Sequence, residues 1–189
     1  MRKKMKKISC IILAIFLCFT TTVPTMAASS VYNAAVASYM NYMKGKSGYY
    51  KIIDVDGNGI PELLMNNRTQ GYCYNEIRTY NPRTRRNMNV AVIGYGKGYN
   101  MSFRVSKTCH TVMLPNGNTG GMSYTIFKIS GTSARKIVQA ERFNGKFEKG
   151  YAINGKKVSK SKYDNTIAKY MKNTPLYNFF IKKISYRTF

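Results

Sequence analysis

The chain has 189 residues, of which 31 are Lys or Arg and only seven are Asp or Glu, so its formal net charge is +24. This length suits one ordinary domain with one core. The basic surplus predicts attraction to polyanions such as cell-wall polymers, acidic glycans, anionic lipid or nucleic acid. A single histidine and dispersed cysteines exclude a zinc-finger pattern.

The N-terminus is typical of an export signal. Five basic residues within positions 2–7 precede an apolar run at 8–19 that is too short to span a bilayer comfortably. Small residues around Ala27 offer a cleavage site. We therefore predict a signal peptide at 1–27 and a single mature domain at 28–189. The mature protein would be secreted, with a possible wall association and no transmembrane segment.

A helix is predicted from Ser29 or Ser30, acting as the cap, to about Lys44. Apolar residues recur there at a spacing of four, which is typical of a helix face that packs on a core: Val31, Ala35, Tyr39 and Met43. Gly45 and Gly48 would end the helix.

The middle of the chain alternates in the manner of β-strands, with turns about every ten residues. Strands are expected at 49–53, 60–65, 72–80, 89–95, 100–105, 111–114, 123–129, 136–143 and 147–153. This rhythm predicts an antiparallel meander. Asn144-Gly145 and Asn154-Gly155 are typical of two-residue type I′ turns, and the stretch 115–117 is expected to be a loop.

A second helix is predicted from near Ser159, with either Ser159 or Ser161 as its cap. Asn173-Thr174-Pro175 would end it, and 176–189 would form a closing strand. The predicted fold class is therefore α+β: an antiparallel β meander with an N-terminal and a C-terminal helix packed on the sheet.

The segment 54–63, Asp-Val-Asp-Gly-Asn-Gly-Ile-Pro-Glu-Leu, concentrates oxygen ligands. Asp54, Asp56 and Asn58 occupy loop positions 1, 3 and 5, and Glu62 occupies position 9. Ile60 would add its backbone carbonyl. This pattern predicts a Ca²⁺ site as the cofactor site of the chain. An EF-hand is disfavoured because its twelfth position lacks the required Glu, and the alternative is a Gly/Asn-rich hairpin turn whose acids face solvent.

The acidic loop resembles the calcium loops of integrin-type FG-GAP repeats, which lie between two strands. The wider pattern resembles uncharacterised secreted proteins and lipoproteins of Gram-positive, clostridia-like bacteria. The resemblance rests on the stretch 50–64 and on Ile-Asn-Gly-Lys-Lys-Val-Ser at 153–159. It implies an extracellular or envelope location and a metal-bound loop, and it implies no reaction.

Cys73 and Cys109 remain after removal of the signal peptide. Outside the cell they could form a disulfide that closes a loop of about 36 residues and stabilises the fold by roughly 3–4 kcal/mol. The alternative is a pair of free thiols. We predict the disulfide.

Two basic clusters are candidate polyanion-binding surfaces. The first comprises Arg83, Arg85 and Arg86, and the second comprises Lys156 and Lys157. The sequence thus favours a secreted, non-enzymatic calcium-binding module that associates with anionic envelope polymers and has no specific nucleic-acid partner. The alternatives are a cationic toxin-like protein and an enzyme acting on wall or polyanionic substrate. Such an enzyme would need distant carboxyl groups to converge, for example those of Glu141, Glu148 and Asp164.

Overall fold

The computed structural model describes residues 23–69, 72–97, 103–118, 121–145, 149–171 and 183–184. In these ranges the fold is α+β, as predicted, with two antiparallel sheets and two helices. The strand order in sheet A is β11 (Lys183–Ile184), β1 (Ser47–Ile53), β2 (Glu62–Thr69), β3 (Tyr72–Asn81) and β4 (Arg86–Lys97). The order in sheet B is β10 (Lys156–Val158), β9 (Lys149–Ile153), β8 (Ser133–Asn144), β7 (Gly121–Ser130), β6 (Thr111–Asn118) and β5 (Arg104–Ser106).

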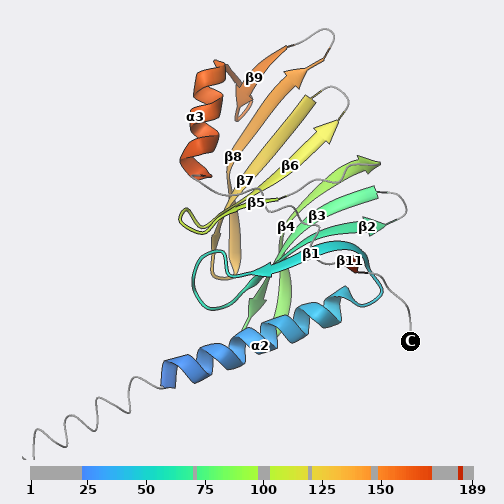
Figure 1. The fold of residues 1–189 in the computed structure, drawn as a ribbon, viewed down its shortest axis with the longest axis vertical. Coiled ribbons are helices and arrows are strands. Elements are labelled where there is room, and N and C mark those ends of the chain that lie inside the picture. Colours follow the sequence, from blue (N-terminus) through green and yellow to red (C-terminus); the bar gives the residue numbers. More distant parts are fainter. Residues whose placement is uncertain are drawn as a thin grey trace, which may run out of the picture.

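The two sheets share a buried core, and each carries a helix on its other side (Figure 1). Alternation along the strands explains this layering, because successive side chains point to opposite faces. Leu64 and Ile77 of sheet A pack with Leu114 and Phe127 of sheet B in the shared core. The predicted antiparallel meander is confirmed, because β1 to β4 and β5 to β10 pair in chain order, and the meander divides into two sheets after β4.

Helix α2 (Val23–Met43) covers the outer side of sheet A. Ala35, Tyr39 and Met43 are buried there against Leu63 and Met65, so the predicted face is confirmed. The predicted start is wrong, because the helix already includes residues 23–28. Proline is tolerated in the first turn of a helix, and the alanines that follow are good helix formers.

Helix α3 (Lys160–Tyr170) covers sheet B and buries Tyr163. Ser159 is its N-cap, because its side chain accepts a hydrogen bond from the Lys162 amide (3.2 Å). Most of the predicted closing strand lies outside the described residues, but Lys183–Ile184 pairs with β1. Neither helix in the described ranges is both long and apolar enough to cross a membrane.

The turn predictions have mixed outcomes. Asn154-Gly155 is a two-residue turn between Ile153 and Lys156, with φ values of +50° and +76°, as a type I′ turn requires. The prediction at Asn144-Gly145 is wrong, because Asn144 still pairs with Lys149 and the connection is longer than two residues. The loop predicted at 115–117 is also wrong. These residues continue β6, and their backbones pair with β7.

Candidate metal site

The acidic segment forms the connection between β1 and β2, and it winds around the Asp54 carboxylate. Asp54 Oδ1 accepts the Gly57 amide (2.8 Å), and Oδ2 accepts the Gly59 amide (2.9 Å). Both glycines have positive φ, +75° and +83°, which residues with a β-carbon rarely adopt. The two glycines therefore allow the tight winding that brings the loop carboxylates together.

Asp56 lies on the inner side of this loop and faces sheet B. Its Oδ2 accepts hydrogen bonds from the Gly131 amide (2.6 Å) and from the Asn58 side-chain amide (3.1 Å). The Asn58 side-chain oxygen in turn accepts the Ile60 amide (2.7 Å). The predicted ligand Asn58 is thus engaged in supporting the loop in this structure.

Glu62 begins β2 and is fully buried. Its Oε2 accepts the Val55 amide at 2.9 Å, whereas Oε1 is buried and has no hydrogen-bond partner among the described residues. Burial raises the pKa of this carboxyl to about 8. The Val55 amide opposes the rise, and the charges of Asp56 and Asp54 add to it. A buried carboxylate oxygen without a partner is costly, so this group requires a proton or a cation.

The three carboxyl groups converge. One oxygen from each of Asp54, Asp56 and Glu62 lies within 4.8 Å of the other two, an arrangement that could hold a metal ion. Two ionised carboxylates at such a separation repel by about 3 kcal/mol at an effective dielectric constant of 20. The oxygen donors, the mutual repulsion and the orphaned Oε1 all fit a hard cation. The alternative prediction, a hairpin turn whose acids all face solvent, is therefore wrong for Glu62, which is fully buried.

The site is fixed by buried contacts on both sides. Val55 lies fully buried in the core between the sheets. On the other side, the Tyr39 hydroxyl of α2 donates a hydrogen bond to the Pro61 carbonyl oxygen (2.8 Å). Sequence reasoning did not identify Tyr39 or Gly131 as supports. The apolar Val55 between two acids was the one signal that the loop inserts into a core.

The first predicted polyanion cluster lies at the exposed connection between β3 and β4, with Arg83 and Arg85 in the turn and Arg86 as the first residue of β4. Arg83, Arg85 and Arg86 are all exposed. The Asn81 side-chain oxygen supports this turn by accepting the Arg83 amide (2.9 Å) and the Thr84 amide (3.3 Å). The guanidinium groups are thus displayed at a defined turn.

The second predicted cluster, Lys156 and Lys157, is exposed on β10, the outermost strand of sheet B. The arginine turn belongs to sheet A. The two clusters therefore lie on different sheets, and no pair of neighbouring strands carries both of them.

The predicted Cys73–Cys109 disulfide is wrong for this structure, because Cys109 is a free cysteine. Cys109 lies in the turn between β5 and β6 of sheet B, and its sulfur contacts the Lys169 carbonyl oxygen of α3 at 3.7 Å. Cys73 belongs to β3 of sheet A. The spacing of two cysteines in the sequence carries no information on whether their side chains meet in the fold.

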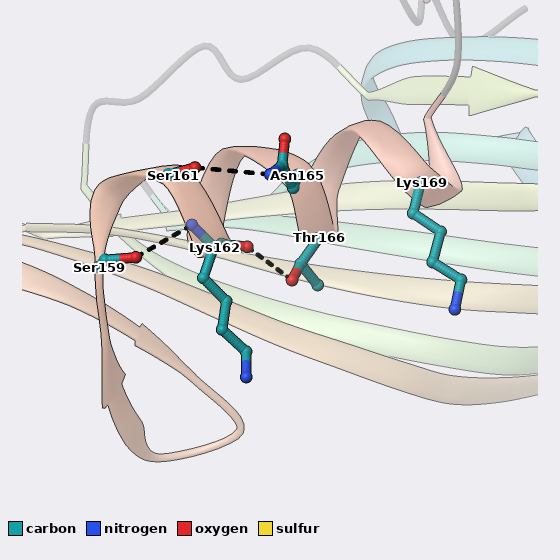
Figure 2. Close-up of a pocket in the computed structure, with 6 residues that line it drawn as sticks. All are labelled: Ser159, Ser161, Lys162, Asn165, Thr166 and Lys169. Carbon is teal, nitrogen blue, oxygen red and sulfur yellow. Dashed lines mark hydrogen bonds between the residues drawn. The ribbon is translucent and has the colours of Figure 1, made fainter.

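The carboxyl groups considered for an enzyme have separate partners. Glu141 accepts a hydrogen bond from the Gln139 side-chain amide (2.9 Å), and Asp164 pairs with Lys160 (2.5 Å) on α3. Glu148 lies outside the described residues. Polar side chains on the exposed side of α3 line a surface pocket, and Figure 2 shows them as sticks. The pocket is lined by hydroxyl, amide and ammonium groups from Ser159, Ser161, Lys162, Asn165, Thr166 and Lys169.

Comparison of the chain with protein-family models, curated proteins and solved structures found no match.

Proposed function

We propose that the loop at 54–62 binds Ca²⁺ and that the protein is a secreted, calcium-stabilised module. Its basic surface would associate with anionic polymers of the cell envelope. The observation that carries the metal site is the buried Glu62 oxygen, which has no partner among the described residues and belongs to a carboxyl group that converges with Asp54 and Asp56.

The choice of calcium rests on the donor set. The converging side chains are all carboxylates, which are hard oxygen ligands and favour Ca²⁺ or Mg²⁺ over metals that prefer imidazole or thiolate. Mg²⁺ demands near-ideal octahedral geometry and dehydrates reluctantly, whereas Ca²⁺ accepts irregular shells of six to eight oxygens. A loop in which one ligand is buried and two are half-buried suits the less demanding ion. Weak, millimolar affinity would suffice outside a cell.

The role supported best is structural. A bound cation would cancel the repulsion among three carboxylates and give the buried Glu62 oxygen a partner. It would thus favour the ionised form of Glu62, which burial opposes. The folded state would gain stability by mass action, because the unfolded chain does not assemble the site.

Thermal unfolding in calcium or chelator tests this site. We expect the melting temperature of the wild-type protein to rise with Ca²⁺ concentration and the variant Asp54→Ala/Asp56→Ala to show no such rise. Asp164→Ala is the matched control, because it removes an acid of α3 that is paired with Lys160 outside the loop. Its calcium response should equal that of the wild type. An unchanged wild-type melting temperature at millimolar Ca²⁺ would refute the site.

The proposed polymer binding is supported by the basic surplus of the predicted mature domain, which keeps 26 of the 31 Lys and Arg residues beside all seven acids. It is also supported by the exposure of Arg83, Arg85 and Arg86 at the connection between β3 and β4. Guanidinium groups form charge-assisted, two-pronged hydrogen bonds with phosphate and carboxylate. A connection that displays three of them suits polymers that carry either group.

A further inference from the structure

The acidic loop of sheet A is hydrogen-bonded to sheet B through the backbone amide of Gly131. Gly131 lies in the short turn between β7 and β8, where Ser130 pairs with Ser133, and it has a φ of +53°. Its amide donates to Asp56 Oδ2 at 2.6 Å, across 75 residues of sequence. The turn is thus tied directly to one of the three converging carboxylates.

The backbone of Gly131 is hydrogen-bonded to sheet A a second time, through its carbonyl oxygen. The Thr79 hydroxyl of β3 donates to the Gly131 carbonyl oxygen at 3.2 Å, and Thr79 is almost fully buried. Both polar groups of Gly131 are therefore engaged by sheet A, the amide by the loop and the carbonyl by β3. We call this pair of hydrogen bonds the Gly131 clamp.

From this geometry we infer that the cation and the Gly131 clamp are coupled, so that ion binding at the loop strengthens the attachment of the β7–β8 turn of sheet B to sheet A. This inference rests on the proposed calcium site. It adds a conformational role to that site, because the ion would act on a segment that supplies none of the converging carboxylates.

The coupling follows from the position of Asp56. Without a cation, repulsion from the Asp54 carboxylate favours movement of the Asp56 carboxylate away from the cluster. The Gly131 amide holds that carboxylate in place through Oδ2. A cation removes the repulsion, so the hydrogen bond is kept at lower cost. By linkage, an intact clamp must favour the cation to the same degree that the cation favours the clamp.

Two measurements on the full mature chain test this coupling. The first is hydrogen exchange of the Gly131 amide, followed by NMR with calcium and with chelator. We expect calcium to slow this exchange at least ten-fold. The second is calorimetric titration of Thr79→Val, which removes the hydroxyl of the clamp and leaves every converging carboxylate unchanged. The affinity falls by the part of this hydrogen bond's free energy that depends on the ion, so we expect a decrease of at least about two-fold and at most about ten-fold, the full value of one hydrogen bond.

Thr166→Val is the matched control, because the Thr166 hydroxyl donates to the Lys162 carbonyl oxygen (2.7 Å) within α3. Its calcium affinity should be that of the wild type. If calcium binds and raises the melting temperature but leaves Gly131 exchange and the Thr79→Val affinity unchanged, the coupling is refuted and the calcium site stands. If calcium does not bind the wild type, both are refuted. Should Thr79→Val fail to fold, the exchange of the wild-type Gly131 amide decides alone.

Discussion

Two connections of sheet A carry opposite charge and are built in opposite ways. The acidic loop between β1 and β2 inserts Val55 and Glu62 completely into the protein, and contacts from α2 and sheet B hold it. The basic turn between β3 and β4 exposes Arg83, Arg85 and Arg86, and its described support is a pair of hydrogen bonds to Asn81. Both connections are charged, but only the acidic one is part of the interior.

This difference separates two uses of charge. Buried charge is expensive and must be compensated, so a cation bound at the acidic loop, as proposed, would stabilise the fold. Exposed charge costs little and contributes little to stability, so the basic turn is free to serve a binding partner. Substitutions in the loop should therefore change unfolding, and substitutions in the turn should change binding.

The largest expected effect is a pH dependence of stability in chelator. The folded pKa of Glu62 is about 8, whereas the ordinary value is 4.5, so the folded state holds a proton that the unfolded chain releases between these values. Stability from this group is therefore complete below pH 4.5 and is lost as the pH rises through 8. The slope approaches about 1.4 kcal/mol per pH unit within that window.

Urea unfolding at pH 5 and pH 8 measures this effect. Glu62→Gln lacks the titrating group and should lose less stability than the wild type over that interval, and calcium should remove most of the wild-type loss. Equal pH slopes for the two proteins in chelator would show that Glu62 does not titrate abnormally.

The next effect concerns the insertion of the loop into the core. Val55→Ala removes two buried methyl groups from the cluster shared by both sheets. We expect a loss of about 2 kcal/mol in the free energy of unfolding. Val92→Ala on β4 is the control, because Val92 is 49% exposed and its truncation should change stability by less than about 0.5 kcal/mol. Similar losses in both variants would contradict the description of the loop as part of the interior.

The smallest effect on stability is expected in the basic turn. Changing Arg83, Arg85 and Arg86 to Ala should leave the unfolding midpoint nearly unchanged, because all three side chains are exposed. The same variant should bind purified anionic wall polymer more weakly, and its affinity should depend less steeply on salt. Lys156→Ala/Lys157→Ala provides a comparison from the other sheet. Salt titrations that coincide with those of the wild type would exclude the turn as a binding surface.

The sequence was sufficient for the local elements of this fold. Alternation located the nine strands from β1 to β9, and the α2 face of Ala35, Tyr39 and Met43 followed from helical spacing. The division into two sheets was beyond such reasoning. Alternation shows that a strand has two faces and does not show which neighbour covers each one.

The candidate site was predicted in part for the same reason. The spacing of Asp54, Asp56 and Glu62 indicated a cation loop because ligand order is a local property. The burial of Glu62 and the contact with Gly131 depend on segments far away in the chain. Likewise, the error over Cys109 arose because pairing of cysteines depends on their distance and orientation in the fold, which sequence spacing does not give.

The contacts of the acidic loop with Tyr39 and Gly131 span 22 and 75 residues. The acidic loop can therefore make both contacts only after α2 and sheet B have packed on sheet A. Interactions that form after the rate-limiting step of folding act mainly on the reverse rate. We therefore expect calcium, bound as proposed, to lower the unfolding rate of the protein and to leave its refolding rate almost unchanged.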